Sequence, residues 1–460
     1  MKLSMLSLRA AGLALGATGL LAASPALAAG ASCPADYAKQ ARALVEEHAK
    51  SNRFSGSVLV AKDGVVLLRE GFGAANREWD IPNAPDTKFR LGSVTKQFTG
   101  VAIMQLVEAG KLSVDDPISK YYADAPAAWS KITIKHLLTH TSGIPSYTGI
   151  PGFFDKDGRL PLKPAEIVKL TQDKPLEFEP GSKYAYDNTG YVLLGYVIEK
   201  VSGQTYADYV SQHLFQPLGL KNTGYDVTSQ VLAKRASGYS PAKGGGWENA
   251  DYLDMSLPYA AGSLYSTVDD LLAWDRALTD GKLLAEASRK ALWTDYGNKY
   301  GYGWAVSDQS GHSRISHGGG IHGFSTALNR YPNDGLVTIV LSNFQAASSS
   351  QIANNLAGLC FGTYQPVKAI AVPTATLDRY VGAYALRPDF ILKVFREGDK
   401  LITQATGQGP IAIVATAPGE FLAVGPNAKL IFEQTGDAPA TALTLRQGSR
   451  DMKAPRVAEK

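Results

Sequence analysis

The stretch from Ser93 to Gly110 constrains the fold most, because apolar residues occupy nearly every face of one long helical pattern. These residues are Val94, Phe98, Val101, Ile103, Met104, Leu106 and Val107. Gly110 suits the left-handed conformation that often ends a helix. A helix that is apolar all round is buried. The sequence therefore predicts a buried central helix over Ser93–Ala109, around which the rest of the chain is organised.

A serine and a lysine open this helix, three residues apart. Residues at i and i+3 emerge on the same side of a helix, and its first turn favours a developing anion. Burial lowers the pKa of a lysine, which can then take a proton from a serine hydroxyl. Ser93 is thus predicted to be a nucleophile. The motif alone leaves open a capping serine with a solvated Lys96, since a second copy spans residues 240–243.

The first residues have the pattern of a secretory signal. The positively charged Lys2 and Arg9 come before an apolar centre over residues 10–23. A pattern of small residues typical of a cleavage site ends at Ala28. Lipidation of Cys33 is not expected, because Gly30 stands where an aliphatic residue would be needed. We expect residues 1–28 to be removed and the rest to be exported, to the periplasm or the extracellular space.

The charge balance excludes some classes of partner. The formal net charge of +4 falls to +2 when Lys2 and Arg9 are lost with the signal. No strong charge field indicates nucleic acid or a membrane surface, and no later apolar run is long enough to span a bilayer. The remaining chain of about 430 residues is long enough for more than one core.

Two cysteines allow two interpretations. In an oxidising compartment Cys33 and Cys360 could form a disulfide that ties together the two ends of a first domain. Cys360 also lies in an apolar run, where a buried free thiol is common. Both interpretations stay open at the level of sequence.

Several scaffold elements are expected along the first two thirds of the chain. A helix is predicted over residues 35–51 and a hairpin over residues 56–70, with its turn at residues 63–64. His136 and His140 have a metal-ligand spacing on a helix, but no third ligand is apparent and a structural role is expected. Helix caps are predicted at Thr205 and Ser266, each followed three residues on by an acid.

A tyrosine and an asparagine two residues apart stand in a loop before an apolar helix predicted over residues 191–200. In an extended backbone Tyr186 and Asn188 point to the same side and would face one pocket. The phenol can pass a proton, and the amide can orient a lysine or a substrate carbonyl. Copies of this short motif at residues 296–298 and 331–333 lie in turns and are set aside.

Three glycines follow a histidine just before a predicted hairpin of residues 324–331 and 336–343. Glycines on a strand edge let a ligand approach the backbone, whose N–H groups can serve an oxyanion. His317, Gly319 and Gly320 are therefore candidate substrate-binding residues. A capping or core histidine is the alternative for His317.

In this order the three motifs resemble those of the serine β-lactamase and penicillin-binding-protein superfamily, particularly the branch related to class C β-lactamases. The resemblance covers about residues 40–362 and includes the stretches 115–117, 137–143 and 216–220. It implies an α+β fold, in which helices flank an antiparallel sheet beside a helical region of residues 110–280. No G-x-S-x-G elbow occurs in the sequence, which argues against an α/β-hydrolase.

The resemblance also implies roles for the site residues. Ser93 would be acylated, Lys96 would be the neighbouring base, and Tyr186 would shuttle a proton to the leaving group and from the attacking water. Asn188 would orient Lys96 and the substrate. The N–H groups of Ser93 and Gly320 would form the oxyanion hole. Whether Lys96 or Tyr186 takes the first proton stays open, because coupled groups share their titration.

One departure from the family pattern bears on the substrate. His317 and Gly318 stand where many relatives have a lysine and a threonine that hold a substrate carboxylate. We therefore expect hydrolysis of an ester or amide, as by an esterase, a D-aminopeptidase or a D,D-peptidase, with at most weak β-lactamase activity. Cell-wall peptides are possible substrates, and no metal or organic cofactor is expected. The alternative is a non-catalytic or slowly acylated protein that binds peptidoglycan or β-lactams.

The last stretch alternates short β-rich pieces with turns, which indicates a small antiparallel barrel. Residues 377–384 resemble the opening of the lipocalin-like domain found in some relatives. The predicted organisation is a signal (1–28), a hydrolase domain (29–365), a linker (366–375) and a C-terminal β-barrel (376–460). The barrel is expected to cover the cleft or support the first domain.

Overall fold

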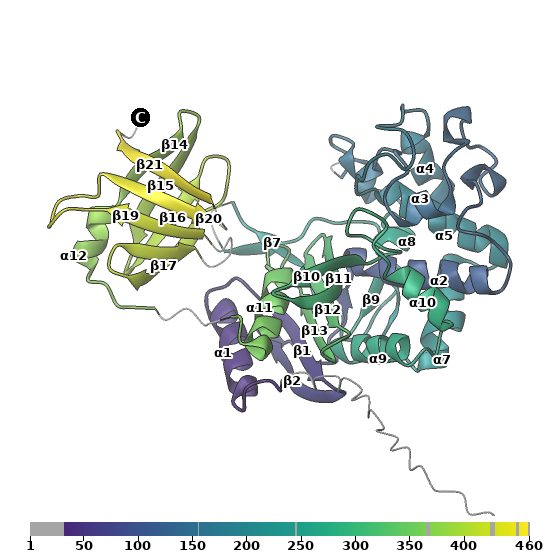
Figure 1. The fold of residues 1–460 in the computed structure, drawn as a ribbon, viewed down its shortest axis with the longest axis horizontal. Helices are drawn as coiled ribbons and strands as arrows, with labels where there is room; N and C mark the ends of the chain where they lie inside the picture. Colours follow the sequence, from purple (N-terminus) through teal and green to yellow (C-terminus); the bar gives the residue numbers. More distant parts are fainter. Residues whose placement is uncertain are drawn as a thin grey trace, which may run out of the picture.

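The computed structural model of the chain describes residues 32–154, 156–243, 246–364, 369–423, 428–447 and 450–458. The predicted signal lies outside the described residues. Figure 1 shows a large region of helices and sheet and, beside it, a β-barrel formed by the C-terminal part of the chain. Within the described residues, none of the helices combines the length and the apolar character needed to cross a membrane.

An antiparallel sheet lies at the centre of the first region. Over the described residues it has six strands, in the order β10-β11-β12-β13-β1-β2. They are β1 (Gly56–Lys62), β2 (Val65–Phe72), β10 (Ala305–Gln309), β11 (His312–Ile321), β12 (Phe324–Tyr331) and β13 (Leu336–Ser342). β1 pairs with β13, so the N-terminal hairpin and the late hairpin form one sheet. The antiparallel sheet that the resemblance implies is thus present, and both predicted hairpins belong to it.

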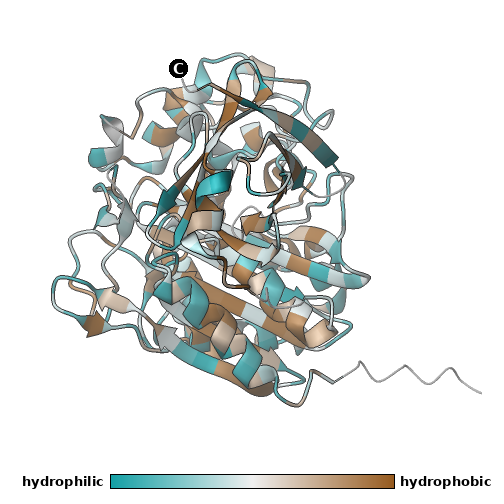
Figure 2. Ribbon diagram, turned by 90° about the vertical axis from the view of Figure 1, so that its left-hand side faces the viewer, coloured by the Kyte–Doolittle hydropathy of each residue, from teal (hydrophilic) through white to brown (hydrophobic). Residues whose placement is uncertain are grey.

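Helices cover both faces of this sheet. Every residue of β1 and β13 is buried, which is typical of central strands packed on both sides. Val58 packs in a cluster with α1 (Tyr37–Lys50) and α11 (Ser349–Phe361), whereas Leu59 belongs to the larger cluster around α2 (Thr95–Glu108). In Figure 2 brown, apolar residues alternate with teal ones along helices and strands, as expected for elements with one buried face.

The central helix begins later than the sequence predicted. Gly92–Val94 forms a 3₁₀ turn, η1, and α2 follows from Thr95. Gly92 has φ of 53°, a left-handed conformation that suits glycine and reverses the chain before the helix. The prediction that this helix is buried is confirmed, since Phe98 is fully buried and stacks on Trp274 with ring centroids 4.0 Å apart.

Helices surround α2 on its other sides. They are α3 (Ile134–Leu138), α4 (Pro164–Gln172), α5 (Asn188–Ser202), α6 (Tyr206–Val210), α7 (Gln216–Leu218), α8 (Tyr259–Gly262), α9 (Val268–Thr279) and α10 (Glu286–Leu292). Small sheets lie among them, formed by β3 (Ala74–Asn76), β4 (Ile81–Pro82), β5 (Phe89–Arg90), β6 (Gly224–Tyr225), β7 (Tyr239–Pro241), β8 (Trp247–Asn249) and β9 (Leu264–Ser266).

The helix caps are partly as predicted. Thr205 caps α6 by accepting the N–H of Asp208, which confirms that prediction. The cap predicted at Ser266 is wrong by one residue, because Ser266 pairs as the last residue of β9 and Thr267 caps α9. The helix predicted from residue 191 begins earlier, at residue 188, where Asp187 caps it.

A disulfide joins Cys33 to Cys360. It links the segment before α1 to the end of α11, the two helices that share one face of the sheet. Of the two interpretations that the sequence left open, the structure shows the disulfide.

The C-terminal residues form a closed barrel of eight antiparallel strands, as predicted. The strands are β14 (Gly382–Arg387), β15 (Phe390–Glu397), β16 (Lys400–Ala405), β17 (Ile411–Ala417), β18 (Glu420–Ala423), β19 (Ala428–Glu433), β20 (Ala442–Gln447) and β21 (Arg450–Val457). A short helix, α12 (Thr374–Leu377), precedes them. The barrel has its own core, in which Tyr380 and Tyr384 pack on Phe432. The domain boundaries given above stay predictions.

Candidate active site

Ser93 lies at the mouth of a cavity of about 420 Å³ between the sheet and the helices. It stands in η1, which packs against the end of β11. β10 pairs with β11 only as far as Ser316, so the β11 edge from His317 onward is not covered by β10. That edge and Ser93 therefore meet at the same cavity, which Gly320 also lines.

Lys96 is fully buried beneath Ser93. Its Nζ atom lies 3.2 Å from Ser93 Oγ, 2.8 Å from Asn188 Oδ1 and 2.9 Å from the carbonyl oxygen of Ala261. A neutral amine has two N–H groups and one lone pair. The two N–H groups can be donated to Asn188 and Ala261, which leaves the lone pair for the Ser93 hydroxyl.

The surroundings of Lys96 favour this neutral amine. Burial lowers the pKa of Lys96 to about 7, and the charge of Asp187 opposes part of that fall. Burial likewise raises the pKa of Asp187 to about 7, against the hydrogen bonds that it accepts from backbone N–H groups. The two groups are coupled through their charges, so protonation of one affects the other.

Tyr186 stands beside the same pair of residues. Its ring lies 4.8 Å from Lys96 Nζ, and an interaction with Ser93 affects its pKa. Burial raises the pKa of Tyr186 above its ordinary value, although 39% of the residue surface is exposed. The phenol is therefore neutral near pH 7 and acts as a hydrogen-bond donor that can exchange its proton.

Asn188 is held on three sides. Its side-chain oxygen accepts from Lys96, its Nδ2 donates to Thr148 Oγ1 at 3.0 Å, and its backbone N–H donates to Ser146 Oγ at 3.1 Å. It is the first residue of α5, not part of an extended strand, and it lines the cavity of Ser93. Both side chains approach Lys96, but they line different cavities, because the backbone is extended only as far as Asp187 and α5 begins at Asn188.

His317 lies near the other residues but faces Tyr300. Its Nδ1–H donates to the carbonyl of Gly318 at 2.6 Å, so Nε2 accepts from Tyr300 O–H at 2.7 Å. Burial, followed by the charge of Lys96, lowers the pKa of His317 to about 3. Both ring nitrogens are thus occupied and the ring is neutral. Among the described residues that line the cavity of Ser93, His317 does not appear.

The two candidate glycines differ in their surroundings. A Cβ atom on Gly319 would lie 2.0 Å from the Leu91 carbonyl oxygen and 2.2 Å from Thr326 Oγ1, so only glycine fits there. A Cβ atom on Gly320 would meet no heavy atom within 4 Å. Gly319 therefore brings β11 against η1, while Gly320 leaves room for a ligand over its backbone.

His136 and His140 do not share a helix. α3 ends at Leu138, and His140 has a φ of 55°. His136 Nδ1 accepts the N–H of Thr133, whereas His140 Nδ1 accepts the N–H of Asp187 at 3.1 Å. The His140 ring packs on Tyr186 with centroids 4.3 Å apart. These contacts agree with the predicted structural role.

Sequence reasoning missed three residues that shape the site: Asp187, Ala261 and Tyr300. Asp187 stands between two motif residues, and a carboxylate at that position was a signal that could have been used. The carbonyl of Ala261 and the phenol of Tyr300 come from segments without a motif. Only the tertiary structure brings them to Lys96 and His317.

Known proteins resemble this chain in sequence. Residues 41–360 match the sequence model of a family described as Beta-lactamase. The chain is 29% identical over 444 residues to penicillin-binding protein 4* of Bacillus subtilis (strain 168), and this match covers 90% of the chain and 97% of the relative. It therefore extends well beyond the residues matched by the family.

Solved structures resemble it in fold. The octameric penicillin-binding protein homologue from Pyrococcus abyssi has a TM-score of 0.68 and 27% identity, covering 90% of this chain and 99% of that one. A D-stereospecific amidohydrolase from Streptomyces sp. has a TM-score of 0.60 and 27% identity, covering 71% of this chain and 98% of that one.

Proposed function

Because the chain belongs to the β-lactamase family of serine hydrolases, we propose that it is an exported hydrolase that cleaves an ester or amide through an acyl-enzyme on Ser93. The observation that carries this proposal is the setting of Lys96. A fully buried amine with a pKa lowered to about 7 lies 3.2 Å from the Ser93 hydroxyl, with its remaining donors in use. A purely structural lysine would not need this arrangement.

In the acylation step, neutral Lys96 takes the proton of Ser93 as Oγ attacks the substrate carbonyl carbon. We assign the first proton to Lys96 and not to Tyr186, because burial lowers the pKa of the lysine and raises that of the phenol. The N–H groups of Ser93 and Gly320 would hold the oxyanion. As the tetrahedral intermediate collapses, Tyr186 donates its proton to the leaving group and regains one from Lys96.

In the deacylation step, water replaces the leaving group. Water passes a proton to Tyr186 as the phenol passes its own to neutral Lys96, and the oxygen attacks the acyl carbon. Ser93 Oγ then leaves with a proton returned from Lys96. Asn188 keeps the lysine in place through the 2.8 Å contact, and Thr148 holds the amide of Asn188. All protons move among side chains of this chain, so the proposed reaction needs no metal or organic cofactor.

The cavity favours an apolar acyl group. Tyr147, Phe154, Leu253 and Ile321 line it, and Phe154 packs on His322 with ring centroids 5.0 Å apart. His317 is neutral with both ring nitrogens occupied, so it offers no cation to a substrate carboxylate. We therefore propose esters and amides of apolar acyl groups, including D-amino-acid amides, with slow turnover of penicillins.

The proposed location is the periplasm or the extracellular space. The signal predicted over residues 1–28 and the disulfide between Cys33 and Cys360 support it, since disulfides persist in oxidising compartments. A small molecule or peptide with an ester or amide bond is the proposed partner, cell-wall peptides included. Neither nucleic acid nor membrane insertion after signal removal is part of the proposal.

Intact-protein mass after brief exposure to a fluorophosphonate, a short-chain nitrophenyl ester and a penicillin tests the function. We expect adducts on the wild type that are absent from Ser93→Ala. Ser240→Ala is the matched control, because Ser240 and Lys243 repeat the motif spacing outside the site. The control should react like the wild type, and the ester adduct should clear faster than the penicillin adduct. No adduct with any reagent would favour the non-catalytic binding protein.

A further inference from the structure

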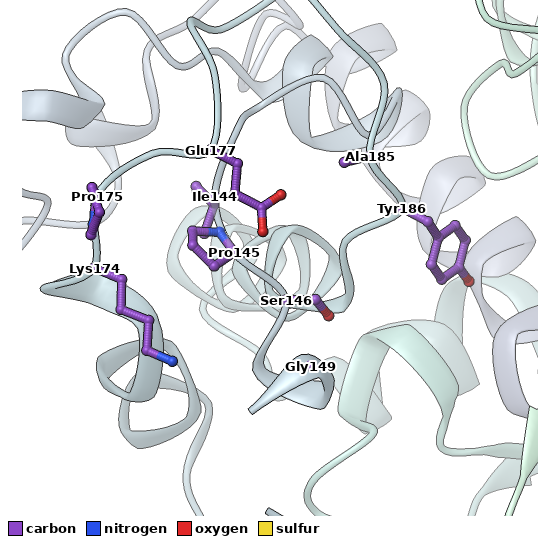
Figure 3. A pocket seen from close by; sticks show the side chains of 9 residues that line it. All are labelled: Ile144, Pro145, Ser146, Gly149, Lys174, Pro175, Glu177, Ala185 and Tyr186. Carbon is purple, nitrogen blue, oxygen red and sulfur yellow. The ribbon is translucent and has the colours of Figure 1, made fainter. Parts of the chain in front are cut away.

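A second cavity, of about 390 Å³, adjoins the site on the other side of Tyr186. Ile144, Pro145 and Pro175 give it apolar walls, and Lys174 and Glu177 give it two opposite charges. Figure 3 shows Tyr186 at one end, Lys174 at the other, and the Glu177 carboxylate between them pointing into the open space. None of the proposed chemistry uses either charged residue.

The loop of residues 146–148 separates this cavity from that of Ser93. Ser146 lines the second cavity and accepts the backbone N–H of Asn188, whereas Thr148 lines the first and accepts from the Asn188 side chain. Tyr186 forms a wall of the second cavity, and its ring also lies 4.8 Å from Lys96 Nζ beside Ser93. A group held in the second cavity therefore lies beside the residue proposed to protonate the leaving group.

The wall that carries Glu177 is held by the backbone. Its N–H donates to the Gly143 carbonyl at 2.8 Å, and a Cβ atom on Gly143 would lie 2.2 Å from the Phe178 carbonyl oxygen. On the opposite wall, the N–H of Ala185 donates to the His140 carbonyl at 3.0 Å. The Glu177 carboxylate is thus presented from a fixed backbone.

The two charges have no partner in the part of the chain that the structure describes. Lys174 and Glu177 line one cavity, yet they form no ion pair with each other or with another described residue. When a cation and an anion line one cavity without pairing, the cation can bind an anionic group of a ligand and the anion can bind a cationic group. Such a ligand carries both a cation and an anion.

We propose that this cavity is the leaving-group subsite, and that it selects an amino acid or short peptide bearing both a side-chain ammonium group and a free carboxylate. The ammonium faces Glu177 and the carboxylate faces Lys174. This inference rests on the proposed function, because it takes Tyr186 as the proton donor to the leaving group. Lys174 would thus bind the substrate carboxylate, which the neutral ring of His317 cannot do.

Aminolysis of the acyl-enzyme tests the subsite, because an amine that intercepts the acyl group occupies the position of the leaving group. The neutral amine attacks the acyl carbon, its proton passes to Tyr186 and Lys96, and Ser93 Oγ leaves with a proton. The acyl-enzyme is formed from a short-chain nitrophenyl ester. The ratio of aminolysis to hydrolysis product is measured by mass for racemic lysine, norleucine and lysinamide.

We expect the wild type to use lysine about fivefold better than norleucine, which lacks the side-chain ammonium, or lysinamide, which lacks the carboxylate. The effect is modest because the ion pairs with Glu177 and Lys174 would be partly exposed. Glu177→Gln should abolish the preference over norleucine, and Lys174→Met the preference over lysinamide. Glu179→Gln and Lys169→Met are matched controls, because these exposed residues lie nearby but do not line the cavity. Equal use of all three amines by the wild type, or variants that keep both preferences, would overturn the proposal.

A binding measurement separates failure of the subsite from failure of the proposed function. If the ester leaves no adduct on Ser93, saturation-transfer NMR with millimolar lysine and norleucine on Ser93→Ala replaces aminolysis. Lysine contacts that exceed those of norleucine, and that Glu177→Gln removes, support the subsite without the reaction. Identical signals for the two amino acids, or signals that Glu177→Gln leaves unchanged, contradict it.

Discussion

At the scale of single residues, the site depends on one buried amine that contacts a serine three residues away and two residues from distant parts of the chain. Ser93, Asn188 and Ala261 surround Lys96 Nζ, and none of them is an acid. Burial has the larger effect and lowers the pKa of Lys96, whereas the charge of Asp187 acts through space and raises it. The protein thus keeps a lysine that loses its proton near neutral pH.

Acylation should depend on pH through this lysine. Its pKa of about 7 means that the neutral, active form increases as the pH rises through 7. We expect kcat/KM for a nitrophenyl ester to rise with a midpoint near pH 7. Asp187→Asn removes a charge that raises the pKa of Lys96, so the midpoint should move to lower pH. A midpoint that stays in place in this variant would show that another group controls acylation.

Removal of the amine should affect the reaction far more than the fold. Lys96→Met keeps the length of the buried side chain without its ammonium, and apolar replacements of buried charges are often neutral or stabilising. We expect acylation to slow about 10²- to 10⁴-fold, measured by stopped-flow release of nitrophenol, with no loss of unfolding free energy. A variant that unfolds much more easily but acylates at the wild-type rate would argue for a structural lysine.

At the scale of elements, the site exists because η1 and β11 approach each other closely. Gly92 turns the chain into η1, and Gly319 allows β11 to contact the carbonyl of Leu91. Thr326 on the neighbouring strand also donates to that carbonyl at 2.7 Å. The position of Ser93 relative to the Gly320 N–H is therefore set by backbone contacts, not by side chains of the site.

Two neighbouring glycines should respond differently to the same substitution. Gly319→Ala forces a Cβ atom into two oxygens, so we expect a loss of about 1–3 kcal/mol of unfolding free energy and slower acylation. Gly320→Ala meets no atom within 4 Å and should leave unfolding by urea nearly unchanged. Equal midpoints for the two variants would contradict the close approach of β11 to η1.

At the scale of the whole molecule, the sheet separates two cores. The cluster that contains α2 lies against one face, and the cluster with α1 and α11 lies against the other. The disulfide between Cys33 and Cys360 closes the second cluster, on the face away from Ser93. The barrel adds a third core formed only by residues from Val372 onward.

Loss of the disulfide should lower stability without changing the chemistry. The bond joins residues 327 positions apart, and release of such a long loop increases the freedom of the unfolded chain. We expect the double variant Cys33→Ala with Cys360→Ala to lose about 2–5 kcal/mol of unfolding free energy. Its ester hydrolysis at 25 °C should match that of the wild type. Reduced wild-type protein serves as the control for the substitutions themselves.

Much of the fold could be predicted from local pattern. The alternation and turns of the last stretch indicated a barrel, and the long apolar run after Ser93 indicated a buried helix. The misplaced boundaries share a cause. The helix start at Ser93 and the cap at Ser266 were assigned from propensity, but η1 and β9 use those residues in tertiary contacts that a local pattern does not contain.

By itself the sequence determined which residues can do chemistry, because a serine, a lysine, a tyrosine and an asparagine at fixed short spacings are local facts. It also determined the periodicities that make the sheet, the central helix and the barrel. Only the tertiary structure decided the protonation state and the contacts of those residues. Burial sets the pKa of Lys96, Tyr300 occupies the ring of His317, and Ala261 completes the lysine's contacts. These effects depend on distances between segments far apart in the chain, which spacing along a sequence does not fix.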